Sequence, residues 1–74
     1  MILSAQYDFP PEQFLPLDDI LEGIAGRESV SAGTWISGSL WCRDMQWEFD
    51  SLEEASIIAN RMKAIEGVKV SLDA

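Results

Sequence analysis

The chain contains no histidine, a single cysteine and few basic residues. Without histidine, the usual proton shuttle near neutral pH is missing, and neither a serine nor Cys42 has an imidazole base to activate it. One cysteine excludes an internal disulfide and a zinc site built on several thiolates. We therefore expect a protein that is not an enzyme, carries no cofactor or metal and belongs to a reducing compartment, with Cys42 as an inert filler.

Basic side chains are outnumbered thirteen to five, which gives a formal net charge of −8 over 74 residues. Nucleic-acid binding draws most of its affinity from Lys and Arg that release counterions from phosphates. We therefore expect no direct nucleic-acid partner. The same charge favours docking on a basic protein surface, although acidic surfaces also serve plain solubility.

Long apolar runs are also absent, since no stretch approaches the roughly 18–20 residues that cross a bilayer. The opening Met-Ile-Leu-Ser-Ala-Gln lacks the basic region and apolar core of a signal peptide. We expect a cytoplasmic protein with no membrane partner. A chain of this length with 47% apolar residues predicts one folded domain, residues 1–74.

Alternation with period two predicts a strand at 2–9 and another at 68–73. In the first strand one face carries Leu3, Ala5, Tyr7 and Phe9, and in the last it carries Val68, Val70 and Leu72. Pro10 and Pro11 should end the first strand, because neither donates a hydrogen bond to a sheet. Residues 12–15 then form a loop or a single turn.

Two amphipathic helices are predicted. The first begins at Pro16, carries Asp18 and Asp19 in its first turn, ends near Gly26 and buries Leu17, Ile20, Leu21 and Ile24. The second spans 51–66, with Ser51 and Glu54 as a capping box and Gly67 as its stop. Its predicted buried stripe is Leu52, Ala55, Ile58, Ala59, Met62 and Ile65, and Ile57 lies off that stripe.

A hairpin over 29–48 has two candidate registers. A three-residue loop at 37–39 places Trp35 opposite Trp41 but mixes apolar and charged residues on one face. A two-residue loop, Gly38-Ser39, suits a type II′ turn and places Ile36 opposite Trp41, with Ala32 opposite Met45 and Val30 opposite Trp47. We predict the second register, with Trp41 and Trp47 in the core and Trp35 on the opposite face.

The resulting order is β-α-β-β-α-β, which resembles the ferredoxin-like fold. The resemblance implies an α+β two-layer sandwich: a four-stranded antiparallel sheet with two helices on one face and the first and third strands at its centre. The other face, called here the open face, should be polar and acidic. Its predicted residues are Ser4, Gln6, Asp8, Ser31, Trp35, Cys42, Asp44, Gln46, Glu48, Lys69 and Ser71.

Three known uses of this architecture find no support in the residues. Metallochaperones carry C-x-x-C after the first strand, where this chain has Asp8-Phe9-Pro10-Pro11. RNA-recognition domains stack bases on central-strand aromatics, where this chain has Gln6, Asp44 and Gln46. Acylphosphatases need an Arg and an Asn that hold phosphate, and Asn60 is expected on a helix. A Mg²⁺ or acid/base pair from Asp44 with Glu48 or Asp8 competes with the simpler interpretation of a solvated polar face.

The favoured hypothesis is a small acidic inhibitor or adaptor that docks on a basic surface of a nucleic-acid-handling protein. In size and charge the chain resembles phage anti-CRISPR and DNA-mimic inhibitors. Trp35 would act as an anchor, unless the 14–15 bridge, a terminus or a second copy covers it. The alternatives are an ACT-like small-molecule sensor and a structural homo-oligomer such as a homodimer. The predicted partner-binding residues are Trp35, Asp44, Glu48, Asp8, Gln46, Asp18, Asp19, Glu53 and Glu54.

Overall fold

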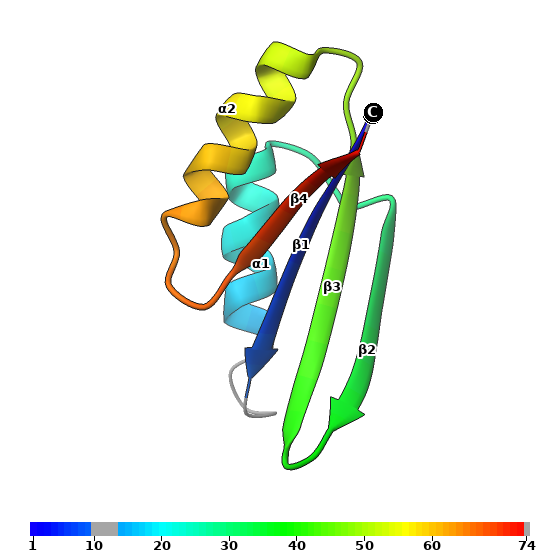
Figure 1. Cartoon of the computed structure of the whole chain (residues 1–74), viewed down its shortest axis with the longest axis vertical. Helices are drawn as coiled ribbons and strands as arrows, with labels where there is room; N and C mark the ends of the chain where they lie inside the picture. The colour runs from blue at the N-terminus through cyan, green and yellow to red at the C-terminus, as the bar shows by residue number, and fades with distance from the viewer. Residues whose placement is uncertain (10–13, 74) are drawn as a thin grey trace.

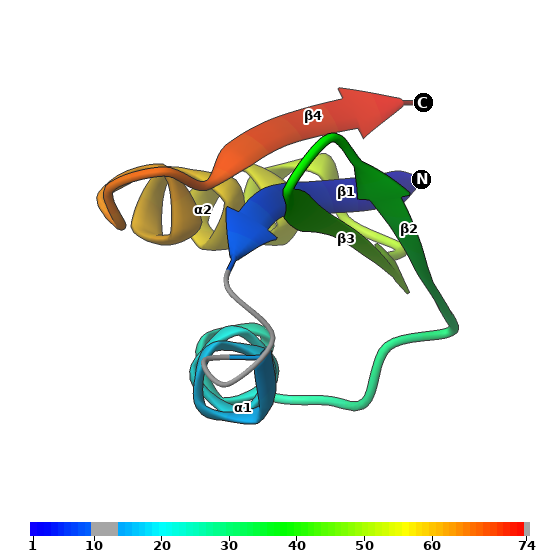
Figure 2. The same cartoon turned by 90° about the horizontal axis from the view of Figure 1, so that it is seen from below.

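The computed structural model describes residues 1–9 and 14–73 and has two layers, a four-stranded antiparallel sheet and two helices (Figure 1). The strands are β1 (Ile2–Phe9), β2 (Ser31–Ser37), β3 (Leu40–Glu48) and β4 (Lys69–Asp73). The helices are α1 (Phe14–Ala25) and α2 (Leu52–Lys63). Figure 2 shows both helices on the same side of the twisted sheet. The predicted α+β class is thereby confirmed.

The strands hydrogen-bond in the order β2-β3-β1-β4, and all neighbours are antiparallel. β1 and β3 therefore lie inside the sheet, and β2 and β4 form its edges. The period-two alternation of β1 is confirmed, because Leu3, Ala5, Tyr7 and Phe9 are all buried against the helices. Val68 is buried just before β4, and Val70 and Leu72 pack against the core from within it.

The hairpin has the predicted two-residue turn, with Ile36 paired to Trp41 and Ala32 to Met45. Gly38 has φ +63°, and Ser39 has no positive φ, which fits a type II′ turn. Trp47 is fully buried, as predicted, and its indole N–H donates to the backbone carbonyl of Arg27 at 3.2 Å. The hairpin pairing thus follows from its turn chemistry.

The predicted burial of the hairpin's apolar face fails toward the turn. Trp41 was expected in the core and is 38% exposed, and its partner Ile36 is 64% exposed. At the other end of the hairpin, Val30 was expected opposite Trp47; it is 61% exposed, and its backbone N–H donates to the Gln46 carbonyl at 2.8 Å. The turn end of the hairpin extends beyond the helices in Figure 1. Ile36 and Trp41 pair across the two strands there and remain exposed, so apolar alternation near the turn does not by itself produce burial.

Helix α1 differs from its prediction in start and orientation. It begins at Phe14, so that Pro16 is its third residue and Asp18 and Asp19 fall beyond the first turn; residues 10–13 lie outside the described ranges. Proline is tolerated there because the first turn needs no internal N–H donor. Ile20, expected in the core, is 52% exposed, and Asp18 is buried beside Leu21 and Ala25. The other predicted residues pack as expected, because Leu21 is buried and Leu17 and Ile24 pack against the core, so the helix is rotated only enough to exchange Ile20 for Asp18. It ends as predicted at Gly26, whose φ is +73°.

Helix α2 buries most of its predicted stripe. Ala55, Ile58, Ala59 and Met62 are buried, but Leu52 is 59% exposed because it is the first helical residue, at the end of the layer. The Ser51 hydroxyl accepts a hydrogen bond from the backbone N–H of Glu54 at 3.3 Å, which is one of the two hydrogen bonds of the predicted capping box. The helix ends at Lys63, three residues before the predicted end, and a turn follows.

Candidate functional site

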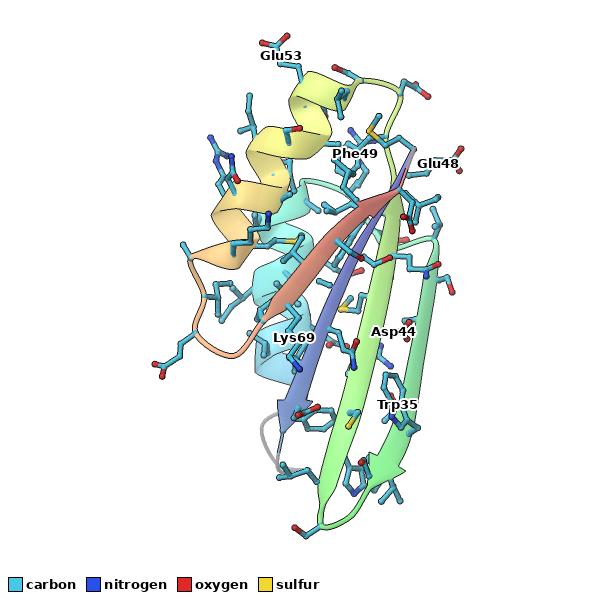
Figure 3. The ribbon with its side chains drawn as sticks, in the orientation of Figure 1. Trp35, Asp44, Glu48, Phe49, Glu53 and Lys69 are labelled. Atoms are coloured by element: carbon cyan, nitrogen blue, oxygen red, sulfur yellow. The ribbon has the colours of Figure 1, made fainter. Side chains whose placement is uncertain are left out.

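The open face of the sheet is built by alternate residues of all four strands, and their pairing sets them in rows. Asp8, Cys42 and Trp35 form one row across β1, β3 and β2. The next row contains Lys69, Gln6, Asp44 and Gly33, and the following one Ser71, Ser4, Gln46 and Ser31. The last row holds Asp73, Ile2 and Glu48. Figure 3 shows Trp35 and Asp44 along the hairpin and Glu48 at its far end.

The open face is acidic. Among the described residues it carries four carboxylates, from Asp8, Asp44, Glu48 and Asp73, against the single cation of Lys69. Asp73 was not among the predicted site residues, although the alternation of Lys69, Ser71 and Asp73 places it on this face. This surface would attract a basic partner and repel phosphate.

A shallow depression of about 190 Å³ crosses the middle of the open face. Its lining residues are Ser4, Gln6, Asp44, Lys69, Val70 and Ser71. Asp44 is partly buried, and its carboxylate reaches toward β2: a Cβ placed on Gly33 would lie 3.0 Å from the Asp44 Oδ1 atom. The absence of a side chain on Gly33 thus gives Asp44 its position.

Large apolar side chains are exposed on both faces of the hairpin near its turn. Trp35 is 43% exposed and Leu40 45% on the open face, and Ile36 and Trp41 are exposed on the helix side. The prediction that Trp35 lies off the core face is confirmed. Leu40 did not stand out in the sequence, because its neighbours in the turn gave no continuing alternation. These residues form an exposed apolar patch beside the carboxylates.

Cys42 lies on the open face between Asp8 and Trp35, yet only 6% of its surface is exposed. The hydrogen bond with Asp8, followed by burial, raises the pKa of the Cys42 thiol above its ordinary value. A raised pKa keeps the sulfur in its unreactive thiol form near neutral pH, because the thiolate is the nucleophile. This agrees with the inert interpretation of Cys42.

Asp18 was predicted as a partner-binding carboxylate, and the structure corrects this. It is 6% exposed and lies between α1 and the sheet, where Arg43 Nη2 approaches its Oδ2 atom to 2.9 Å and Tyr7 donates a hydrogen bond to it. Arg43 also donates to the Thr34 hydroxyl at 2.8 Å. A carboxylate so enclosed is not available to a partner surface. Asp18 has a structural role.

The remaining predicted carboxylates lie away from the open face. Asp19 is exposed on α1, and Glu53 and Glu54 are exposed at the start of α2, where Figure 3 shows Glu53 far from Trp35. Glu54 forms an ion pair with Arg27 at 2.8 Å. The structure thus brings Asp8, Trp35, Asp44, Gln46 and Glu48 together on one face, and it separates Asp19, Glu53 and Glu54 from them. No cluster of three or more potential metal ligands occurs within 1–9 and 14–73.

Neither of the two described helices has the length and apolarity needed to span a membrane. Comparison with family models, with curated protein sequences and with solved structures finds no match to this chain.

Proposed function

We propose that this chain is a non-enzymatic interaction domain whose open face docks on a basic surface of another protein. The observation that carries the proposal is the set of four carboxylates on that face with Lys69 as its one described cation. Trp35 and Leu40 add exposed apolar area at one end of the same face. Charge then steers the encounter, and the apolar side chains supply the contact that holds the complex.

The kind of partner follows from the sign of the charge. Proteins that handle nucleic acids carry dense basic surfaces for phosphate, and an acidic face competes for such a surface. We therefore propose an inhibitor of the DNA-mimic type, comparable in size and charge to the phage anti-CRISPR proteins, that acts in the cytoplasm. The strand order and the β-α-β-β-α-β sequence also support a ferredoxin-like topology as the finer description of the fold.

Affinity capture from a lysate of the source organism tests the proposal. The baits are the wild type, an open-face variant Asp44→Lys/Glu48→Lys, and a matched control Asp19→Lys/Glu53→Lys. Both variants change the charge by the same amount on exposed or partly exposed carboxylates, but the control changes it on the helices. The lysate is treated with nuclease and capture is run at low and high salt, because charge-driven docking weakens as salt screens it.

The expected result is one salt-sensitive protein partner that the wild type and the helix variant retain and the open-face variant loses. Melting temperatures of the three baits show whether each is folded. Equal capture by the open-face variant, or loss only with the helix variant, would contradict docking through the open face.

A further inference from the structure

The edge strand β2 lacks the usual protection of an exposed sheet edge. It is seven residues long, and the sequence contains no charged residue between Glu28 and Arg43. Natural sheets protect exposed edges with charges, prolines or very short strands, because unpaired N–H and C=O groups recruit further strands. The opposite edge, β4, follows this rule: it has five residues and carries Lys69 and Asp73. The β4 edge is therefore protected against pairing with another strand by its short length and its charges, and the β2 edge is not.

Apolar side chains on both faces of β2 are exposed. Ile36 is 64% exposed on the helix side, and Trp35 is 43% exposed on the open face. A strand with one buried face exposes polar residues on the other, whereas this strand exposes large apolar residues on both. The pattern is that of a strand inside a sheet rather than at its edge.

The hairpin turn decides which backbone groups face outward. A two-residue turn makes Ser37 and Leu40 a hydrogen-bonded pair, so the N–H and C=O groups of every second residue, from Ser37 back to Ser31, point at β3. The groups of Ala32, Thr34 and Ile36 consequently point to the free edge. Three residues of β2 thus offer donors and acceptors to another strand.

We propose that a second copy of this chain pairs with β2, antiparallel and centred on Thr34, to form a homodimer. In this register Thr34 meets its own counterpart, and each large side chain meets a small one: Trp35 lies opposite Gly33 of the second copy, and Ile36 lies opposite Ala32. In the strand Ser31–Ser37, the large side chains thus lie on one side of Thr34 and the small residues that they would meet lie on the other. An isologous twofold interface requires this kind of complementarity.

Registers shifted by two residues keep the outward backbone groups in place but lose the size matching. One shift sets Trp35 opposite Trp35 of the second copy, and the other sets Ile36 opposite Val30 and Trp35 opposite Ser31. Both also leave an end of the seven-residue strand unpaired. The register centred on Thr34 pairs every residue of β2, and it sets each exposed Ile36 against Ala32 of the second copy.

The pairing also explains the position of Asp44. Its carboxylate reaches to the site where a Gly33 side chain would stand. In the dimer the indole of Trp35 from the second copy occupies the space over Gly33, and an indole N–H is a donor that seeks an acceptor. Asp44 provides that acceptor. The two open faces then join on one side of a continuous sheet, and the dimer stands independently of the proposed function.

Sedimentation equilibrium of the pure chain tests the dimer. The wild type should approach twice the monomer mass of 8.2 kDa as concentration rises. Ile36→Lys should raise the dimer dissociation constant at least about tenfold, because both copies lose a buried isoleucine and gain a charge at the pairing edge. Ile57→Lys is the matched control: Ile57 is also an exposed isoleucine, 48% exposed, on α2. It should dimerise like the wild type.

Disulfide trapping tests the register. With Cys42 replaced by serine, Thr34→Cys should form a covalent dimer on oxidation, because a self-paired position brings two Cα atoms to about 5.5 Å. Ile36→Cys in the same background should not, since two copies of position 36 would lie more than about 10 Å apart. Far-UV circular dichroism confirms that each variant is folded.

A monomer mass that does not change with concentration would overturn the proposal. So would a dimer that Ile36→Lys leaves as tight as Ile57→Lys does. Equal cross-linking at positions 34 and 36 would overturn the register. If Ile36→Lys does not fold, the wild-type mass and the two cysteine variants still decide the outcome.

Discussion

At the scale of single residues, Asp18 and Arg43 attach α1 to the sheet by charge. The two side chains are 9% and 16% exposed and approach to 2.9 Å. Tyr7 and Thr34 hydrogen-bond to the pair from β1 and β2, so four elements meet at one polar cluster on the buried side of the sheet. A hydrogen-bonded pair in this position tolerates burial, but either partner alone would not.

Removal of one partner should therefore cost more than replacement of both. We expect Asp18→Ala to lower the free energy of unfolding by about 3 kcal/mol, because it leaves the Arg43 guanidinium enclosed without its carboxylate. The double variant Asp18→Leu/Arg43→Met should recover most of that loss. Urea unfolding followed by tryptophan fluorescence measures both values. If the losses of the single variants Asp18→Leu and Arg43→Met add up to the loss of the double variant, the pair is not coupled and this expectation is wrong.

The Tyr7 hydroxyl should make the stability of the fold depend on pH in the alkaline range. Burial, and then its hydrogen bond to Asp18, raises the pKa of the Tyr7 hydroxyl above its ordinary value. A raised pKa means that the folded state favours the protonated phenol, so this contribution to stability is complete below the unfolded-state pKa of about 10 and is lost as pH rises above it. Tyr7→Phe should lose less stability than the wild type between about pH 9 and 11. Parallel pH profiles of the two urea midpoints would contradict this.

Residue types and spacing predicted most of the buried residues. They did not predict that Asp18 is buried or that Ile20 is exposed. The stripe of Leu17, Ile20, Leu21 and Ile24 is a good helical pattern, and an aspartate beside it reads as solvent-facing. Only the position of Arg43 on the facing strand makes Asp18 the better buried residue. Because Asp18 and Arg43 lie 25 positions apart in sequence, local periodicity contains no information about their contact.

At the scale of elements, α2 is the helix that the sequence predicts best. Truncation of a buried and of an exposed residue in it can be compared directly. Met62→Ala should lower the free energy of unfolding by about 2–5 kcal/mol, because Met62 is fully buried and its truncation leaves a cavity. Leu52→Ala should cost less than about 0.5 kcal/mol, because Leu52 is 59% exposed at the helix start. Urea unfolding of the two variants gives the comparison. Similar losses would show that Leu52 packs in solution.

The hairpin shows where prediction from sequence stops. Gly38-Ser39 and the apolar alternation determine the pairing of β2 with β3, so that register was predictable. Whether an apolar face becomes buried depends on how far the helices extend over the sheet, which no local pattern specifies. Trp41 and Ile36 consequently satisfy the alternation and remain exposed. The same exposure makes β2 available to a second copy.

At the scale of the whole molecule, charge is unevenly distributed. The net charge of −8 includes the acidic open face and the exposed carboxylates of the helices, whereas residues 29–42 contain no charge at all. Two copies of so acidic a chain repel each other except where such a segment faces its counterpart. The open face and the β2 edge share Trp35 and Asp44, but the open face adds further carboxylates for a basic protein and the edge adds uncharged backbone groups for a second copy.

Of the predicted partner-binding residues, the alternation of β1 and β3 placed Asp8, Asp44, Gln46 and Glu48 on the open face with Trp35 from β2. Asp19, Glu53 and Glu54 were grouped with them by charge alone, and charge does not specify a face. The proposed partner-binding surface consequently contains fewer residues than the sequence predicted.

Competition with DNA tests the central claim most directly. The protein retained by the wild-type bait is loaded with fluorescent duplex DNA and titrated with the chain or with Asp44→Lys/Glu48→Lys, while fluorescence anisotropy reports bound DNA. We predict that the wild type releases the DNA completely and that the variant needs a concentration at least about tenfold higher, equivalent to about 1.4 kcal/mol of lost binding free energy. DNA that stays bound while the chain binds beside it would contradict an acidic face that occupies the phosphate-binding surface.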